Sequence, residues 1–239
     1  MHDNVAMVSK HLLRRAPWSL ALLAAGFLLL VSPSFGQKTD VNVNLYGTIP
    51  TSASGPAIDG NTGQPITGFP SIHQSADPSL GFRVGARHIF SPIFGLELNY
   101  GYNRATQHFT NIPNGVNGSY VVYSHAKPFT VDYVASVPLS FHGIRPFALA
   151  GAGFISYNIS SYAALPPGPP SLPARPEKIP VFEYGVGADF HPGLLPPFMA
   201  LRLQYRGLIG HAPDYRLTYL ATSNLINIAE PQIGVVFKF

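Results

Sequence analysis

Two short stretches of the sequence hold the residue types of a nucleophilic hydrolase. "SIHQSAD" contains His73, Ser75 and Asp77, and "IGHAPDY" contains His211 and Asp214. A histidine activates a serine hydroxyl when a carboxylate orients the imidazole, so the three groups must converge. Both stretches fall in predicted loops, where histidines are mostly solvated, and neither has a recognised metal-ligand spacing. We therefore expect no catalytic residue, no cofactor-binding residue and no metal site.

A larger set of charged residues has a different chemistry, that of an ion-pair network. Each member lies on the polar parity of a strand-like segment, so we expect them to share the inside of a barrel. The set consists of Arg83, Arg87, Glu97, Asp132, Glu183, Asp189, Arg202, Arg206 and Lys238. Opposite charges in a narrow, poorly hydrated space should pair, because an isolated buried charge is costly. Two pairings are expected across short turns: Arg202 and Arg206 with Glu183 and Asp189, and Glu97 with Arg83 or Arg87.

Eight strand-like segments must position these residues. Within a segment, apolar and polar residues alternate, which places them on opposite faces of a strand. The segments cover residues 40–48, 80–90, 95–104, a stretch ending near 137, 145–158, 182–190, 201–206 and 231–239. In segment 145–158 both parities are apolar or small, so its facing stays open. No long stretch after residue 37 has a helical period.

The connections between the segments alternate in length. Long connections cover residues 49–79, 105–118, 159–178 and 208–224, and short ones cover 91–94, 138–144 and 191–197. Long loops at one end and tight turns at the other are typical of an up-and-down barrel. Segments of about ten residues suit a tilted strand that crosses a bilayer. We predict an all-β fold, an eight-stranded antiparallel up-and-down transmembrane β-barrel with four long outer loops and short periplasmic turns.

Composition separates this barrel from a soluble one with an apolar interior. The polar face carries only a handful of charges of both signs, whereas a solvent-exposed surface usually carries about 25–35% charged residues. The polar face is rich in Gly, Asn, Ser and Thr, which suits a narrow interior, and the apolar face suits a lipid belt. The chain has no cysteine, so disulfide and thiol chemistry are excluded. The net charge of +4 owes much to the first fifteen residues, and we expect no nucleic-acid partner.

The first 36 residues have the order of a secretory signal. Lys10, Arg14 and Arg15 precede the apolar run 17–31, and small residues follow it up to Gly36. The run is shorter than the roughly 20 apolar residues that a membrane-spanning helix needs. We expect a signal peptide over residues 1–36, cleavage after Gly36, and a barrel domain over residues 37–239.

The last segment, "PQIGVVFKF", carries a resemblance to a known family. Ile233, Val235, Phe237 and Phe239 share one parity of this strand. This pattern resembles the terminal strand of small outer-membrane barrels of the OmpA/OmpX type, in which the last residue is typically Phe and the assembly machinery recognises the strand. The resemblance implies an assembly signal at these four residues. It extends over residues 38–239 and concerns the barrel domain only, so a cell-wall tethering role is not implied.

The resemblance and the residues lead to a set of functional expectations. We expect a Gram-negative outer-membrane protein with a structural role that displays its loops for adhesion or ligand binding and conducts weakly or not at all. The alternatives are a lipid A-modifying enzyme, similar to the lipid A deacylases, and a narrow pore. An eight-stranded interior is filled by side chains, which argues against bulk conductance. The implied partners are outer-membrane lipid and lipopolysaccharide, the barrel-assembly machinery, periplasmic chaperones and an extracellular ligand.

Overall fold

The computed structural model describes most of the predicted barrel domain. It covers residues 38–58, 62, 64–68, 71–112, 118–137, 143–165, 174–217, 221–222 and 224–239. The predicted signal peptide over residues 1–36 and its cleavage site lie outside the described residues. No helix in the described part of the chain is long and apolar enough to cross a membrane.

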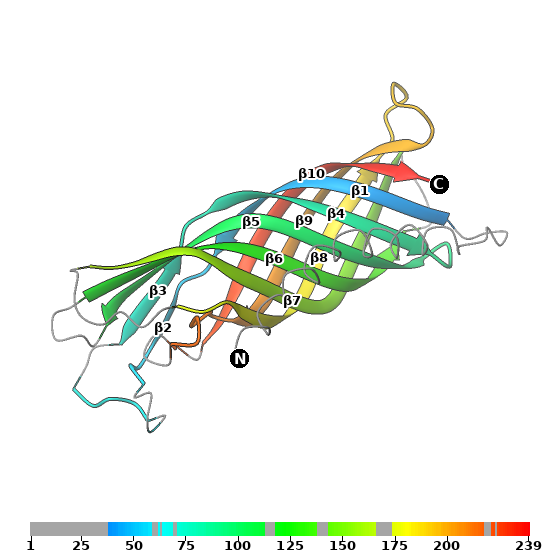
Figure 1. Cartoon of the computed structure of the whole chain (residues 1–239). Coiled ribbons are helices and arrows are strands. Elements are labelled where there is room, and N and C mark those ends of the chain that lie inside the picture. The colour runs from blue at the N-terminus through cyan, green and yellow to red at the C-terminus, as the bar shows by residue number, and fades with distance from the viewer. Residues whose placement is uncertain are drawn as a thin grey trace, which may run out of the picture. The chain divides into compact units, whose positions relative to one another are not determined.

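The described residues form ten strands, eight of which close into a barrel (Figure 1). The strands are β1 (Lys38–Pro50), β2 (Ala53–Gly55), β3 (Ile72–Ala76), β4 (Ser79–Ile89), β5 (Phe94–Ile112), β6 (Gly118–Ser136), β7 (Ile144–Leu165), β8 (Glu177–Phe190), β9 (Met199–His211) and β10 (Leu225–Lys238). Every neighbouring pair is antiparallel, and the order around the barrel is β5, β4, β1, β10, β9, β8, β7, β6 and back to β5. This confirms the predicted eight-stranded antiparallel barrel.

The two faces of the strands have the polarity of a membrane barrel. On β4, Arg83 and Arg87 are buried, whereas their neighbours Phe82 and Val84 are 46% and 41% exposed. Leu203 of β9 is likewise 67% exposed on the outer surface. A barrel with charged side chains inside and apolar side chains outside has its stable environment in lipid, because water would surround the apolar belt.

Segment 145–158, whose facing the sequence left open, is resolved by β7. Phe147, Leu149, Ile155 and Tyr157 are buried inside the barrel, and Phe154 faces outward. The odd positions therefore face the interior. Both parities are apolar because the inward side chains of this strand pack against other side chains while the outward ones face the lipid side.

The barrel strands do not all end where the sequence predicted. β5, β6 and β7 have 19, 19 and 22 residues, about twice the 9–11 residues that a tilted strand needs to cross a bilayer. The predicted loop over residues 105–118 is therefore mostly strand, and the predicted loop 159–178 is shortened. The predicted loop 49–79 contains β2 and β3, and β3 pairs with the outer part of β5. These loop boundaries were wrong because strand pairing continues beyond the membrane, where the outward residues become polar and apolar–polar alternation no longer marks a strand.

Two ends of the barrel can be distinguished. The inner end carries the short connections between β4 and β5, β6 and β7, and β8 and β9, together with the ends of β1 and β10 that hold Lys38 and Lys238. The outer end carries β2, β3 and the extensions of β5 to β7 (Figure 1). In a small outer-membrane barrel the short connections are periplasmic.

The strands are tilted, so a row of paired residues climbs around the barrel. One such row begins near the inner end of β4 and finishes at the outer end of β1. It runs through Arg87, Glu97, Asp132, Gly151, Glu183, Leu208, Ile228 and Pro50. Rows therefore rise in the direction from β4 through β5 to β8, as strand tilt and stagger require.

Candidate functional site

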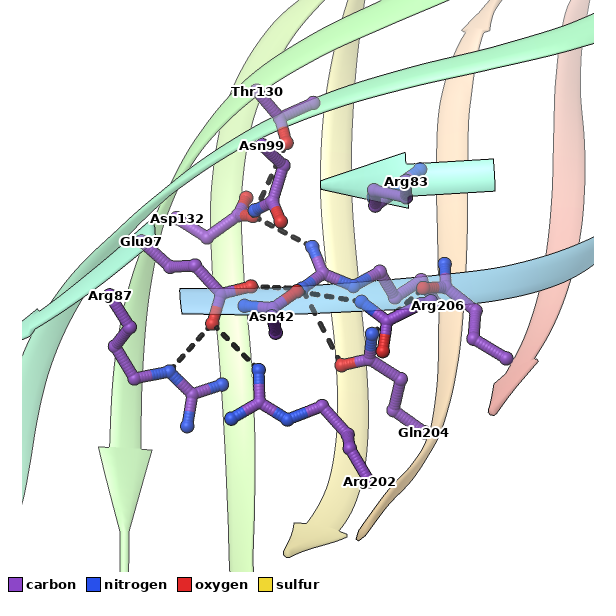
Figure 2. A network of polar contacts seen from close by, with 12 residues as sticks. Asn42, Arg83, Arg87, Glu97, Asn99, Thr130, Asp132, Arg202, Gln204 and Arg206 are labelled. Atoms are coloured by element: carbon purple, nitrogen blue, oxygen red, sulfur yellow. Dashed lines mark hydrogen bonds and ion pairs between the residues drawn. The ribbon is translucent and has the colours of Figure 1, made fainter. Parts of the chain in front are cut away.

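The predicted charged residues other than Lys238 meet in the middle of the barrel interior, where they form the lumen network (Figure 2). Alternation along β4, β5, β6, β8 and β9 directs them inward from five strands. Arg83, Glu97, Asp132, Arg202 and Arg206 are 0% exposed, so solvent does not reach them from either end. Side chains therefore close the cross-section at this level.

The inner half of the lumen network is built around two arginines. Arg87 Nε donates to Glu97 Oε2 at 2.6 Å. Arg202 forms a bidentate pair with Asp189, with distances of 2.6 Å from Nε to Oδ1 and 2.9 Å from Nη2 to Oδ2. The guanidinium carbons of Arg87 and Arg202 also lie 4.3 Å and 4.9 Å from the ring centre of Phe147. Bidentate pairing and ring contacts restrict these long side chains to one arrangement.

The outer half of the lumen network is centred on Arg206. Its Nη1 lies 2.9 Å from Asp132 Oδ2 and 2.8 Å from Glu183 Oε1, and its Nη2 pairs with Glu97. Arg83 pairs with Glu183 at 2.5 Å and with Glu230. Each carboxylate of the network thus has an arginine partner, which offsets the several kcal/mol that burial of an unpaired ion costs.

The predicted pairings can now be placed. Asp189 lies with Arg202, Glu183 lies with Arg206, and Glu97 lies with Arg87 across the short β4–β5 connection. Lys238 points inward at the inner end of β10 but makes no ion pair with the described residues. It is therefore outside the lumen network.

Sequence reasoning missed Glu230, which is 2% exposed and pairs with Arg83. The predicted last strand began at Pro231, because proline usually starts or interrupts a strand. β10 instead begins at Leu225 and tolerates Pro231, since the ladder to β1 is interrupted between the pairs Tyr46–Gln232 and Ile49–Ala229. Gln232 was assigned to the inward face, and residues two positions apart share a face. Extending the alternation back by two residues would therefore have identified Glu230.

Neutral polar side chains add hydrogen bonds to two carboxylates of the network. Asn99 Nδ2 donates to Asp132 Oδ2 at 2.7 Å, and Thr130 Oγ1 donates to the same oxygen at 3.2 Å. Figure 2 shows both side chains directed at Asp132. Gln232 Nε2 donates to Glu230 Oε2 at 3.1 Å. These hydrogen bonds give the carboxyl oxygens partners where water does not reach.

Glycines on the inward parity make room for the charged side chains. A Cβ atom added to Gly151 would lie 2.2 Å from Asp132 Oδ1 and 2.2 Å from the carbonyl oxygen of Val131. An added Cβ at Gly234 would lie 2.1 Å from Asn44 Oδ1. The glycine content of the polar face therefore has a steric cause: the lumen is full.

Above the lumen network the interior is apolar, which the sequence analysis did not predict. Inward residues of β6 to β10 form a plug that we call the apolar plug. It includes Val122, Ala126, Ile155, Tyr157, Ile179, Val181, Leu208, Ile226 and Ile228. The extended strands place these residues close to the outer end of the barrel, where they pack against one another in its interior. A small cavity at its base is lined by Asn103, Tyr157, Ile228 and Glu230, among others.

The connection between β9 and β10 covers the apolar plug. Its Tyr215 is 0% exposed and makes edge contacts with Phe109 and Tyr157, with ring centres 6.3 Å and 6.1 Å apart. Tyr215 has a positive φ of 53°, a conformation that only local contacts maintain in a residue of this size. The carboxylate of Glu177 supplies such contacts, because it accepts the N–H groups of Asp214 at 3.1 Å and Tyr215 at 2.9 Å.

Glu177 lies at the outer end of β8, beyond the membrane-spanning part of the strand. Burial raises the pKa of the Glu177 carboxyl above its ordinary value, and the nearby Asp214 carboxylate raises this pKa further. The two accepted N–H groups oppose this rise. Glu177 is therefore a titratable group that holds a loop over the barrel mouth.

The histidine and serine candidates do not assemble into a nucleophilic site. His73 and Ser75 lie on β3, and His211 ends β9, so their assignment to loops was wrong. His73 Nδ1 is 2.9 Å from the hydroxyl of Ser54. Asp77 binds His108, with 3.1 Å between Oδ2 and Nε2.

Ser75 is the cross-strand partner of His108, yet no hydrogen bond joins the two side chains in the described part of the chain. His211 and Asp214 form no ion pair with one another there either. The described residues also contain no group of three or more His, Asp or Glu side chains that could hold a metal ion. The geometry of an activated serine is thus not present at this surface.

The residues of the predicted assembly signal lie on the outer face of β10. Ile233 and Phe239 are 60% and 78% exposed, and Val235 and Phe237 are partly exposed on the same face. β10, the last strand, pairs with β1, the first strand, over most of its length. This pairing closes the barrel. Phe239 extends this pairing, since its N–H donates to the carbonyl of Thr39 at 2.9 Å.

Several solved outer-membrane barrels are similar in structure to this chain. OprG from Pseudomonas aeruginosa matches with a TM-score of 0.55 and 11% identity, covering 84% of this chain and 95% of OprG. AlkL, solved in lipid bilayers, matches with a TM-score of 0.43 and 13% identity over 87% of this chain and 93% of AlkL. Ail of Yersinia pestis matches with a TM-score of 0.41 and 13% identity over 84% of this chain and 98% of Ail. No protein-family model matches the sequence, and no curated protein matches it.

At 11% identity the similarity to OprG establishes the fold, which is that of a small outer-membrane barrel. The outward apolar belt and the inward charges are independent observations on this chain that agree with this fold. Together they place the barrel in a bacterial outer membrane.

Proposed function

We propose that the protein is a non-conducting outer-membrane barrel that displays a rigid binding surface outside the cell. The observation that carries this proposal is the extension of β5, β6 and β7 to 19, 19 and 22 residues. The outer parts of these strands exceed what a bilayer crossing needs. β2 and β3 continue the same sheet beside β5. A hydrogen-bonded sheet presents its side chains with less conformational freedom than four mobile loops would, which favours binding.

The interior supports the non-conducting part of the proposal. The lumen network closes the middle of the barrel with residues such as Arg206 and Glu97 that solvent does not reach. The apolar plug and Tyr215 fill the outer part. Water and ions would have to displace two successive layers of packed side chains.

The absence of cysteine allows a direct test of the display. A single cysteine in place of Thr110, on the extension of β5, should react with a membrane-impermeant maleimide on intact cells. A single cysteine in place of Gly193, in the short connection between β8 and β9, should react only after the outer membrane is permeabilised. The reverse pattern, or equal labelling at both positions, would contradict the proposal.

Conductance provides the second test. Folded protein added to planar lipid bilayers should give no steady channels, with a sixteen-stranded porin as the positive control. The matched variant combines Phe147→Ala with Tyr215→Ala, which removes one large side chain from each packed region. Channels in the unaltered protein would overturn the non-conducting assignment.

The enzymatic alternative has a separate readout. Lipid A extracted from cells that express the protein should have the same mass as lipid A from control cells, because Ser75 is not bonded to His108. A mass change that disappears in the Ser75→Ala variant would replace the proposed function with a lipid-modifying one.

A further inference from the structure

The charged residues of the strands are sorted by sign between the two faces of the barrel. The carboxylates within strands are Asp40, Glu97, Asp132, Glu177, Glu183, Asp189 and Glu230, and all of them lie on inward positions. The outward face of the strands therefore carries no carboxylate. Asp77, in the connection between β3 and β4, nevertheless reaches this face and binds His108 of β5.

A group of basic residues faces outward from β5, β6 and β8, and we call it the cationic belt. It consists of Arg104, His125, Lys127 and Lys178. Arg104 is the cross-strand partner of His125, and Lys127 and Lys178 both pair with Ser156 of β7 from opposite sides. Residues in such positions have side chains within about 5–6 Å of the next strand. His125 and Lys127 lie two positions apart on the same face of β6, so the two pairing rows are adjacent.

The tilt of the strands brings most of the cationic belt to similar heights. Rows of paired residues rise from β5 toward β8, as the row from Arg87 to Pro50 shows. Lys178 belongs to the lower of the two rows but lies two strands beyond Lys127, whereas Arg104 belongs to the upper row at its lower end. The rise along the rows offsets the difference between them for Arg104, His125 and Lys178, whereas Lys127 lies two residues below His125 on β6.

An aromatic girdle lies directly on the membrane side of the cationic belt. Tyr102, Phe129, Phe154 and Phe182 face outward there. The Lys178 ammonium lies 5.4 Å from the ring centre of Phe154, and Tyr102 stacks on His125 with 5.4 Å between ring centres. Aromatic girdles mark the boundary between the hydrocarbon core and the headgroups. The belt is therefore at the headgroup level of the outer leaflet.

The cations of the belt are not neutralised by the protein. Arg104, Lys127 and Lys178 make no ion pair with any residue in the described ranges. Three such charges on one part of the surface repel one another, and a bound anion reduces this repulsion. Phosphate groups at the headgroup level are the anions that this position meets, and arginine and lysine bind them through charge-assisted hydrogen bonds.

We propose that the cationic belt binds the phosphorylated sugar headgroup of a lipopolysaccharide molecule in the outer leaflet. The aromatic girdle contacts the first part of its acyl chains, and the belt holds its phosphates. This site lies on the outer surface of β5 to β8 and is independent of the lumen and of the proposed display function.

The experiment compares two forms of one ligand on the folded full barrel in nanodiscs of zwitterionic lipid. Lipopolysaccharide and the same preparation after enzymatic dephosphorylation are titrated, and the Kd of each is measured. We expect the phosphorylated form to bind more tightly by about tenfold or more, since each Lys or Arg near a membrane surface contributes roughly fivefold. The preference should weaken in high salt.

Two triple variants separate a defined site from general attraction. R104Q, K127Q and K178Q together should abolish the preference for the phosphorylated form. The control, with Lys38, Arg175 and Arg216 replaced by Gln, removes the same charge from exposed positions elsewhere and should keep the preference. Heat-modifiable gel mobility establishes that each variant is folded.

Several results would overturn the proposal. Equal affinity for the two forms, or a preference unchanged in R104Q/K127Q/K178Q, removes the site. Equal loss in both triple variants reduces the binding to net charge. Competition by inorganic phosphate at the same concentration as the lipopolysaccharide would assign the belt to free phosphate and contradict a lipid site. If R104Q/K127Q/K178Q does not fold, the unaltered protein still tests the proposal in high salt. A preference for the phosphorylated form that is unchanged in high salt would show that the contact is not ionic.

Discussion

Arg206 of β9 and Glu183 of β8 lie 2.8 Å apart in the centre of the barrel, and both side chains are 0% exposed. Arg206 also pairs with Asp132 and Glu97, whereas Glu183 has Arg83 as a second partner. The pair therefore connects the two halves of a network that spans six strands. The network fixes how the strands pack inside a barrel whose outer face has only lipid to contact.

Substitutions at Arg206 and Glu183 should show that the two side chains are energetically coupled. Arg206→Gln leaves three carboxylates without their shared partner and should lower the free energy of unfolding by about 3–5 kcal/mol. Glu183→Gln should cost less, because Arg206 retains two other carboxylates. The double variant should cost less than the sum, with a coupling energy of roughly 0.5–3 kcal/mol. Urea titrations of the protein refolded into lipid, followed by circular dichroism, measure the free energy of unfolding of all three variants. Strict additivity of the two single losses in the double variant would contradict the network.

Gly151→Ala should destabilise the barrel. The new methyl group would overlap Asp132 Oδ1 and the backbone of Val131, and backbone cannot rotate away. Overpacking of this kind typically costs about 1–3 kcal/mol. Gly193→Ala is the matched control, because no heavy atom lies within 4 Å of the Cβ position at Gly193. Equal unfolding midpoints in urea for the two variants would show that the lumen is less tightly filled than the contacts indicate.

Closure of the outer mouth should depend on pH through Glu177. Its pKa in the folded protein is raised above the ordinary value of 4.5, so the folded state binds the proton more tightly than the unfolded segment does. This stabilising contribution is fully present below the ordinary value and is lost as pH rises through the raised pKa. Hydrogen-exchange protection of the Tyr215 and Leu217 amides should accordingly fall over this range.

Glu177→Gln is the control for the pH effect, because glutamine keeps an acceptor oxygen but does not titrate. The variant should show protection at Tyr215 that is independent of pH in the same range. A fall in protection of the same size in both proteins would assign the effect to another group.

The Phe239→Asp variant should reach the outer membrane poorly and yet be nearly as stable as the unaltered barrel once folded. Phe239 is 78% exposed, so its side chain contributes little packing, and a recognition role of the terminal strand would act only during assembly. Outer-membrane yield is measured in cells, and the unfolding midpoint is measured after refolding in vitro. Phe198→Asp, at another exposed phenylalanine near the inner end, should keep a normal yield. Normal yield of Phe239→Asp would refute the assembly signal.

The sequence by itself determined the number of barrel strands and the facing of seven of them. In those strands one residue in two is apolar, and period-two alternation translates directly into two faces. The same rule directed Arg83, Glu97 and Arg206 inward, and short turns limited which strands could bring partners together. Composition then decided which face meets lipid, since the polar face had too few charges for a solvent surface.

Only the tertiary structure decided the facing of β7 and the lengths of β5, β6 and β7. It also decided that Glu230 belongs to the lumen network. Phe147 and Phe154 are alike in sequence, yet one fills the lumen and the other faces lipid, because hydrophobicity does not distinguish a packed interior from a bilayer. Beyond the membrane, the polarity of the outward face changes while hydrogen bonding between strands continues, so the pattern ends before the strand does. Which arginine meets which carboxylate depends on tilt and stagger, and these follow from closure of all eight strands together.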